Sequence, residues 1–276
     1  MSTLDTGTDD LLARVEGHVA RISFNRPDAR NALTDPMYAG FNRVLPQIAS
    51  DPNVRVVMIT GEGGAFCAGG NVKGFAARNK AAASGERPPS TESSIQRLRT
   101  IQREVSLAIR RLPQPVVASF PGAAAGAGLS IGFAADLRIA AERAIIVTAF
   151  ANIGASGDFG TSWFLPRIVG EAKAKELMFM SPRLTAREAL AMNVVNVVLP
   201  DENYDQAALD WCHGLAERAP IALQYIKQNI NRSLEVNLET ALDQEAIAMV
   251  RTMSTADHRE AAAAFVEKRP ARFTGS

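Results

Sequence analysis

The sequence predicts an α/β fold followed by a helical C-terminal part. In the first 200 residues, short runs of apolar and β-branched residues alternate with segments of helical periodicity. From about residue 202 onward, only helical patterns follow. Alternation of strands and helices is typical of a parallel sheet with right-handed crossovers, so we expect one α/β core with helices added at its end.

The expected elements can be placed in order along the chain. Residues 11–24 predict two short strands around a turn at Gly17. Thr34 or Asp35 is expected to cap a helix whose apolar residues recur at helical spacing, namely Met37, Phe41, Val44, Leu45 and Ile48. Further strands are expected at 54–60, 115–120, 137–141 and 194–200. A helical pattern contains Ile95, Leu98, Ile101, Val105, Ile109 and Leu112, whereas the polar, Pro- and Ala-rich segment 78–94 predicts a mobile loop.

Composition excludes several classes of function. The 276 residues contain 30 Lys and Arg against 29 Asp and Glu, which leaves a formal charge of +1. This balance provides no field to hold a polyanion, so we expect no nucleic-acid partner. Apolar runs are interrupted well before the ~18 residues that a membrane span needs, so no membrane partner is expected either.

Cysteine and histidine usage points to a reducing compartment without a metal centre. The chain has two cysteines, Cys67 and Cys212, and its N-terminus is polar and acidic. These features predict neither a disulfide framework nor a secretion signal, and a cytoplasmic location is expected. The three histidines, His18, His213 and His258, are not at ligand spacing, so no metal site is expected.

Two glycine-rich clusters directly follow predicted strands, at 61–75 and at 121–136. Ligands of open α/β sheets bind beyond the carboxyl ends of strands, where small residues let backbone N–H groups approach the ligand. Two such turns facing each other could present two donors to one oxygen, as an oxyanion hole does. The alternative is that the small residues permit tight packing between strand and helix. Neither cluster ends in Gly-Lys-Ser/Thr, which excludes a Walker loop.

Six motifs in order make the chain similar to a known family. They are FNRPDARNAL at 24–33, FCAGGNVKGF at 66–75, GAAAGAGLSIGFAADLRIA at 122–140, LPRIVGEAKAKEL at 165–177, LTAREALAMNVVNVV at 184–198 and HREAAAAFVEKRPARF at 258–273. With these, the chain resembles the crotonase, or enoyl-CoA hydratase/isomerase, superfamily. The resemblance implies a spiral of ββα units with an all-helical C-terminal part, assembled as trimers or hexamers.

The resemblance also implies how the chain is divided and what it binds. Residues 1–200 would form the core with the oxyanion-hole and CoA-binding turns, and residues 201–276 would serve oligomerisation and cover the CoA. The amides of Gly70 and Ala127 would hold the thioester oxygen of an acyl-CoA substrate, and no permanently bound cofactor is expected.

Contacts to the CoA nucleotide are implied from three parts of the chain. The backbone around Ala68, Gly70 and Val72 would hold the adenine. Further contacts would come from Arg26, Lys73, Phe265 and Lys268, the last two from a neighbouring subunit.

The acid or base over the acyl chain decides the reaction. The two glutamates of family hydratases fall on Ser130 and Phe150, neither of which can carry a proton. Asp158 instead lies in a glycine-rich turn before a predicted helix. It falls where isomerases of the 1,2-epoxyphenylacetyl-CoA type carry a catalytic aspartate. We therefore expect Asp158 to shift a double bond, lined by apolar neighbours that raise its pKa.

Alternatives remain open for this segment. An aspartate before a helix is commonly an N-cap. A second alternative is that the protein is an enoyl-CoA hydratase that uses an atypical acid or base. An aryl-CoA dehalogenase ranks behind, because the chain has no histidine between His18 and His213 and the dehalogenase tryptophan falls on Phe150. A non-catalytic CoA-binding oligomer is the alternative from another class.

Overall fold

A mixed sheet forms the centre of the computed structural model, which describes residues 2–70 and 89–276. The strand order among these residues is β1-β2-β3-β4-β5-β7-β10. The bounds are β1 Ser2–Leu4, β2 Leu11–Glu16, β3 Val19–Phe24, β4 Val56–Gly61, β5 Val116–Phe120, β7 Leu137–Ala141 and β10 Val197–Leu199. Neighbouring strands from β1 to β3 in this order pair antiparallel, and neighbouring strands from β3 to β10 pair parallel. A smaller sheet contains β6 (Ala124–Ala125), β8 (Ile145–Val147) and β9 (Leu184–Thr185).

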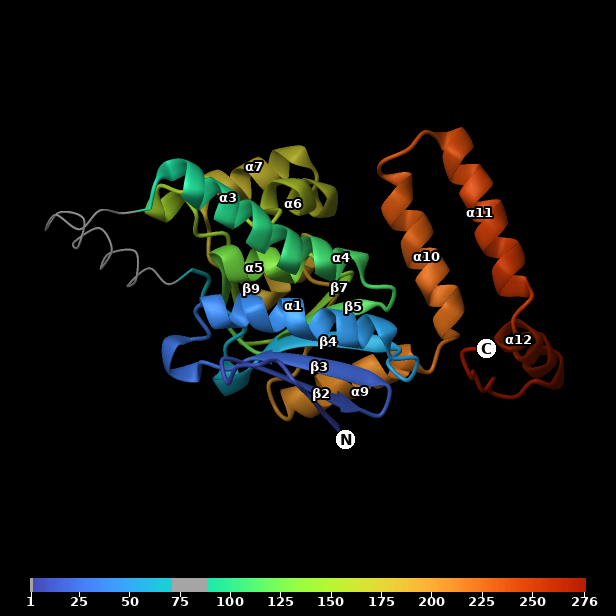
Figure 1. The fold of residues 1–276 in the computed structure, drawn as a ribbon. Coiled ribbons are helices and arrows are strands. Elements are labelled where there is room, and N and C mark those ends of the chain that lie inside the picture. The colour runs from blue at the N-terminus through green and yellow to red at the C-terminus, as the bar shows by residue number, and fades with distance from the viewer. Residues whose placement is uncertain (1, 71–88) are drawn as a thin grey trace, which may run out of the picture.

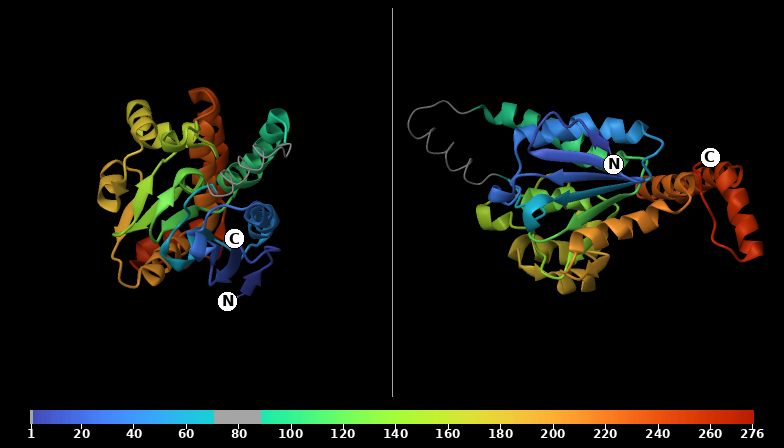
Figure 2. Two further views of the ribbon diagram at one scale, coloured as in Figure 1. Left: turned by 90° about the vertical axis from the view of Figure 1, so that its left-hand side faces the viewer. Right: turned by 90° about the horizontal axis from the view of Figure 1, so that it is seen from below.

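Helices cover both faces of the large sheet (Figures 1 and 2). Their bounds are α1 Asp35–Ser50, α3 Thr91–Gln102, α4 Ala108–Arg111, α5 Gly126–Phe133, α6 Thr161–Val169, α7 Glu171–Met180, α8 Ala186–Ala191, α9 Tyr204–Ala216, α10 Pro220–Ser233, α11 Leu238–Met253 and α12 Ala256–Glu267. On one face, α1 and α5 pack against side chains such as Ile22 and Ile59. On the other, α9 covers Val56 and Met58. The expected α/β class with a helical C-terminal part is confirmed.

The first expected helix illustrates how the sequence directs an element. Thr34 caps α1, since its hydroxyl accepts a hydrogen bond from the amide of Met37 at 3.4 Å. The apolar stripe from Met37 to Ile48 is buried against the sheet. Burial of such a stripe, rather than helix propensity, supplies most of the stability of a helix of this length.

The helical pattern from Ile95 to Leu112 is confirmed as a helix with a local irregularity. α3 continues through a π-helical segment, Arg103–Leu107, into α4. Ile95 and Leu98 are about two-fifths exposed, whereas Val105 and Ile109 are fully buried. The apolar pattern therefore marks a core face only in the second half.

The loop expected over 78–94 is wrong at its C-terminal end. Thr91 already begins α3, because the hydroxyl of Ser90 accepts a hydrogen bond from the amide of Ser93 and caps the helix. A serine that caps a helix also fits a polar loop, which explains the misplaced boundary. Residues 78–88 lie outside the described residues.

The C-terminal helices divide into two groups. α9 packs on the sheet, with Tyr204, Leu209 and Cys212 buried there. α10 is tied to the core by the ion pair of Lys227 with Asp136, whose atoms are 2.7 Å apart, whereas α11 and α12 extend away from the core (Figure 1). The division of the chain at residue 200 stays a prediction. Of the helices that the structure describes, none is both long and apolar enough to cross a membrane.

Candidate active site

The two glycine-rich clusters emerge from neighbouring strands. β4 ends at Gly61 and β5 at Phe120, and the two strands pair in parallel, so both clusters leave the same edge of the sheet. Backbone hydrogen bonds then join the clusters. The amide of Phe66 donates to the carbonyl of Ala123 at 3.0 Å, and the amide of Ala125 donates to the carbonyl of Cys67 at 2.9 Å. The facing turns expected from the sequence are thus held together by their own backbones.

Glycines let these turns approach within van der Waals distance. A Cβ atom on Gly69 would stand 2.8 Å from the carbonyl oxygen of Ala125 and 3.3 Å from the amide nitrogen of Ala127. A Cβ atom on Gly128 would stand 2.5 Å from the sulfur of Cys67. The glycines therefore serve tight packing. The same packing brings the first turn close to the Ala127 amide, so the packing and ligand-binding interpretations are compatible.

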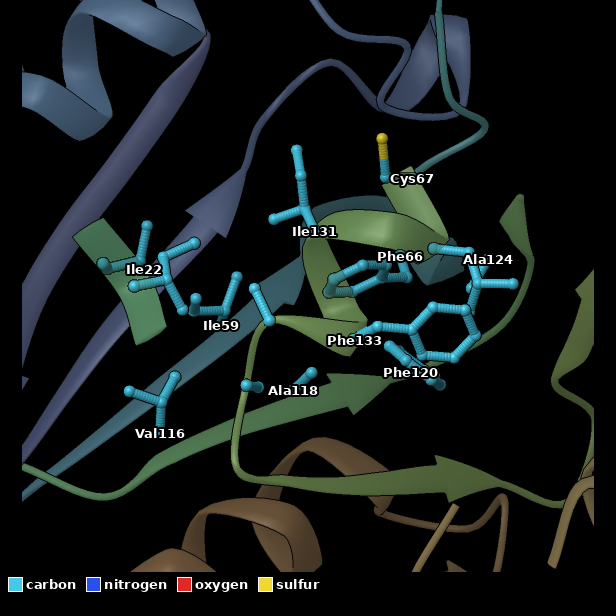
Figure 3. Close-up of a cluster of buried hydrophobic side chains, with 14 of the residues drawn as sticks. Ile22, Ile59, Phe66, Cys67, Val116, Ala118, Phe120, Ala124, Ile131 and Phe133 are labelled. Atoms are coloured by element: carbon cyan, nitrogen blue, oxygen red, sulfur yellow. The ribbon is translucent and has the colours of Figure 1, made fainter. Parts of the chain in front are cut away.

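Aromatic packing supports the turns from below. Phe66 lies within the first turn, and Phe120 is the last residue of β5. Their ring centroids are 4.7 Å apart in an edge-to-face arrangement. Figure 3 shows both rings beside one another, near Cys67 and Ala124. All four side chains are fully buried. The backbone above them is consequently placed on a packed core rather than on a free loop.

Asn31, to which the sequence analysis gave no role, ties the first turn to the chain before α1. Its side-chain amide donates to the carbonyls of Glu62 and Ala65 at 2.9 and 2.8 Å, and its side-chain oxygen accepts from the amide of Arg26 at 2.8 Å. The residue is fully buried. The sequence signal is its place within the motif 24–33, and once buried there the side chain must find hydrogen-bond partners.

Two backbone amides at this junction are candidates for gripping an oxygen. Gly70 pairs with Leu33 in an isolated parallel bridge just after the first turn. Ala127 lies in the first turn of α5, a helix whose N-terminus has no side-chain cap among the described residues. First-turn amides have no partner within a helix and lie at the positive end of its dipole. This end of α5 can therefore accept a negatively polarised oxygen.

The thiol of Cys67 has a structural place in this junction. It donates a hydrogen bond to the carbonyl of Asn31 at 3.0 Å and fills the space beside Gly128. Burial raises the pKa of Cys67 to about 12. The thiol is therefore neutral at physiological pH and is no nucleophile.

Asp158 is not a helix cap, so this alternative is wrong. α6 begins after Gly160 without a side-chain cap, and only the backbone carbonyl of Asp158 takes part, accepting from the amide of Thr161 at 3.1 Å. One carboxyl oxygen, Oδ1, is buried and has no hydrogen-bond partner among the described residues. This burial raises the pKa of Asp158 to about 6. The carboxyl group can therefore both accept and release a proton near neutral pH.

The segment around Asp158 is fixed by contacts from α1 and α3. Phe159 has a left-handed backbone, with φ of 50°, which is rare for an aromatic residue. Its amide donates to the side-chain oxygen of Gln102 at 2.8 Å, and its ring stacks on Tyr38 with centroids 5.6 Å apart. Tyr38 and Gln102 were missed from the sequence. Strain of this kind, held by neighbours, is common beside functional groups.

The two positions onto which the resemblance places the hydratase glutamates are both buried here. Ser130 is fully buried, and its hydroxyl bonds to the carbonyl of Gly126 at 3.1 Å and to the hydroxyl of Thr161. Ser130 thus joins α5 to α6, and its hydroxyl group is engaged within the protein. Phe150 is 6% exposed and lies near Gly157, just before Asp158.

The residues expected to contact a nucleotide are not all brought together within one chain. Arg26 is half-buried and donates to the carbonyl of Ala32 at 3.4 Å, and the amide of Ala68 donates to the carbonyl of Arg30 at 2.9 Å. Phe265 and Lys268 are exposed on and just after α12, in the projecting part and away from α5 (Figure 1).

Two other site candidates cannot be placed, and no metal site is found in the described chain. Val72 and Lys73 lie outside the described residues. Within 2–70 and 89–276, no group of three or more His, Cys, Asp or Glu side chains could hold a metal ion.

Taken together, the described chain combines two backbone amides beyond the carboxyl edge of a parallel sheet with one desolvated carboxyl group, which are the kinds of group that enzymes use to stabilise an oxyanion and to move a proton. The comparisons with known proteins agree. The family model described as enoyl-CoA hydratase/isomerase matches residues 14–276. The chain belongs to this family, and it has the crotonase fold.

Individual relatives cover almost the whole chain. It is 32% identical to the 1,2-epoxyphenylacetyl-CoA isomerase of Escherichia coli, over 96% of this chain and 98% of that protein. It is 33% identical to the human mitochondrial enoyl-CoA hydratase domain-containing protein 2, over 96% of this chain and 88% of that protein. The crystal structure of an enoyl-CoA hydratase from Polaromonas sp. JS666 superposes with a TM-score of 0.86 at 33% identity, covering 96% of this chain and 99% of that one.

Proposed function

We propose that this enzyme shifts a double bond in an enoyl-CoA thioester, with Asp158 as the single acid and base. The observation that carries the proposal is the buried Asp158 carboxyl oxygen without a partner among the described residues, combined with the absence of acids at positions 130 and 150. Splitting water needs two groups that handle protons, whereas moving a proton between two carbons needs one. The isomerase from Escherichia coli among the relatives supports the same choice.

The proposed mechanism assigns separate tasks to backbone and side chain. The amides of Gly70 and Ala127 hold the thioester oxygen, and the α5 dipole favours the negative charge that develops there. The Asp158 carboxylate removes a proton from one carbon of the allylic system, which places the electron pair in the dienolate. The same group, now protonated, returns the proton two carbons away. Phe150 and Phe159 keep water away from the dienolate.

Proton exchange tests this proposal without knowledge of the natural acyl group. Wild-type enzyme in deuterium oxide should incorporate deuterium into an enoyl-CoA such as 3-hexenoyl-CoA, followed by mass spectrometry. Asp158→Asn keeps the shape of the side chain but cannot accept the proton, so the rate should fall by about 100-fold or more. Asp210→Asn, on the exposed side of α9, is the matched control and should keep the wild-type rate.

The pH dependence gives a second readout of the same group. Because the proton acceptor must be ionised, exchange should increase as the pH rises through about 6 and then level off. Rapid hydration of crotonyl-CoA that persists in Asp158→Asn would instead favour the hydratase alternative. Tight CoA binding without any exchange would favour a non-catalytic oligomer.

We also propose that the enzyme is a homotrimer or a hexamer of this chain. α10 to α12 carry large apolar side chains that are more than half exposed in the single chain, among them Ile230, Leu238, Val250 and Phe265. Exposed apolar surface of this extent marks an interaction site. Such packing would also place Phe265 and Lys268 next to the nucleotide end of a neighbouring site. Sedimentation should show a trimer or larger at micromolar concentration, and a monomer would contradict the proposal.

A further inference from the structure

The carboxyl group of Asp158 depends on the surrounding backbone for its position. Its Oδ1 atom is buried and has no hydrogen-bond partner within residues 2–70 and 89–276. A carboxyl oxygen without a partner is not held in place by a bond of its own. The side chain is then directed by its rotamer and by the backbone angles that the rotamer depends on. The contacts that fix the backbone at 158 and 159 therefore decide where the proton carrier lies.

One side chain from α3 holds this backbone. The amide of Phe159 donates a hydrogen bond to Oε1 of Gln102 at 2.8 Å. Among the residues that the structure describes, no other hydrogen bond joins the segment 149–160 to an element other than α6. Gln102 is consequently the polar anchor of the residue that directly follows Asp158.

The anchored residue has a backbone conformation that needs support. Phe159 has a φ of 50°, in the left-handed region that is unfavourable for residues with a side chain. Such a conformation persists only where the surrounding structure holds it. The buried Phe159 ring stacks on Tyr38, which fixes the side chain, and Gln102 fixes the amide. Without the acceptor, rotation of the amide would relieve the strain and move Asp158.

Gln102 lies where its helix changes form. α3 ends at Gln102, and the π-helical segment Arg103–Leu107 begins directly after it. This π-helical segment packs against α1 and α5, and Val105 within it is fully buried. π-helical segments inside α-helices are frequent at functional sites. The irregular turn therefore attaches the helix to the core at the point from which Gln102 reaches the Asp158 segment.

We propose that Gln102 is a positioning residue that holds the Asp158 carboxyl group over the substrate carbon from which it takes the proton. Gln102 acts through the Phe159 amide and is not itself an acid or a base. The inference rests on the proposed function, because it concerns Asp158 as the proton carrier. A displacement of about 1 Å at a reacting group can cost about 100-fold in rate. Loss of the anchor should therefore slow the proton transfer more than it weakens CoA binding.

Replacement of the acceptor oxygen tests the inference. Gln102→Met keeps the length of the side chain but cannot accept from the Phe159 amide. Its kcat for deuterium exchange into 3-hexenoyl-CoA should fall by about tenfold or more, with KM within about twofold of the wild type. Gln102→Glu retains an acceptor oxygen at the same position, so at pH 8 it should retain most of the wild-type kcat.

A second background separates positioning from a general loss of structure. In the presence of Asp158→Asn, Gln102→Met should slow the residual exchange by less than about twofold, because the group on which it acts is already missing. Gln96→Met is the matched control on the same helix. The Gln96 side chain is exposed and donates to Glu92, so this variant should keep the wild-type kcat.

Two results would overturn the role of Gln102. One is a nearly wild-type kcat in a folded Gln102→Met variant, and the other is an equal loss of rate with and without Asp158→Asn. If the melting curve shows that Gln102→Met does not fold, Gln102→Asn takes its place. The shorter amide cannot reach the Phe159 amide, so kcat should again fall, and a nearly wild-type kcat would overturn the inference.

The inference and the proposed function fail in different ways. A large loss of exchange in Asp158→Asn with none in Gln102→Met would remove the role of Gln102 and leave the isomerase proposal standing. Unchanged exchange in Asp158→Asn would overturn the proposed function, and the role of Gln102 with it.

Discussion

The two halves of the candidate site are built differently. The paired turns, residues 62–70 and 121–128, are joined by backbone hydrogen bonds and rest on buried aromatic side chains. The segment from Ala149 to Gly160 is largely open, with residues 151–156 exposed, and the contacts of Phe159 fix its C-terminal end. One half consists of main chain held in place by packing, and the other presents one side chain from an accessible segment.

This difference indicates how one fold can support several reactions. Under the proposed function two amides hold the thioester oxygen, and a packed core can fix their separation whatever side chains lie above it. Choosing the reaction requires a group over the acyl chain, and an exposed segment can change its side chains at little cost to the core. In this chain the segment provides Phe150 and Asp158, while position 130, buried on α5, provides Ser.

The largest expected effect comes from removing one amide from the main-chain half. Gly70→Pro deletes an N–H donor, so exchange into an enoyl-CoA should slow by a few hundred-fold, or roughly 3 kcal/mol of barrier. The rate constant for deuterium incorporation measures the effect. The melting temperature identifies any accompanying loss of structure, because Gly70 also pairs with Leu33. A well-folded variant with nearly wild-type exchange would show that this amide is not part of the grip.

In the side-chain half, a substitution that removes activity should raise the stability of the protein, and Asp158→Asn is that substitution. The pKa of Asp158 is about 6 in the folded chain against 3.8 for a free aspartate. The folded state therefore binds the proton more tightly, and ionisation destabilises it as the pH rises from about 4 to 6. Asp158→Asn removes this cost, so at pH 7.5 the variant should be more stable by about 2–3 kcal/mol.

Denaturant unfolding at several pH values measures this difference. The stability gap between Asp158→Asn and the wild type should be close to zero near pH 4 and reach its full size above pH 6. A variant less stable than the wild type at pH 7.5 would show that the carboxylate has stabilising partners. Such a result would weaken its role as a proton carrier.

The sequence predicted the main-chain half better than the side-chain half. Runs of β-branched residues and the glycines after them have strong local causes, so the two clusters and their common edge of the sheet follow from pattern alone. Asp158 lies in a glycine-rich turn before a predicted helix, and its expected catalytic role came from the resemblance to isomerases of the family. Whether its carboxyl group transfers a proton or caps a helix was left open, because a cap depends on hydrogen bonds that residue spacing does not show.

Other site residues were missed because their partners are remote in sequence. Tyr38 stacks on Phe159 and Gln102 bonds to it, contacts that join α1 and α3 to a segment more than fifty residues further on. Neither residue stands out in its own helix. The short strands β6, β8 and β9 were missed for a similar reason, because two or three residues carry no periodicity.

The smallest expected effect separates backbone strain from crowding in the two halves. Gly69 and Gly154 both have positive φ values, 88° and 67°, so alanine at either site costs about 1 kcal/mol of backbone strain. At Gly154 the added Cβ atom meets nothing within 4 Å, so the loss of stability should be limited to this backbone strain. At Gly69 it would lie 2.8 Å from the carbonyl oxygen of Ala125, so the turns must move apart. We expect Gly69→Ala to lose about 1–2 kcal/mol more, with slower exchange, whereas Gly154→Ala keeps its rate. Denaturant unfolding and deuterium exchange of both variants measure these differences, and equal losses in both would show that the paired turns are as adaptable as the exposed segment.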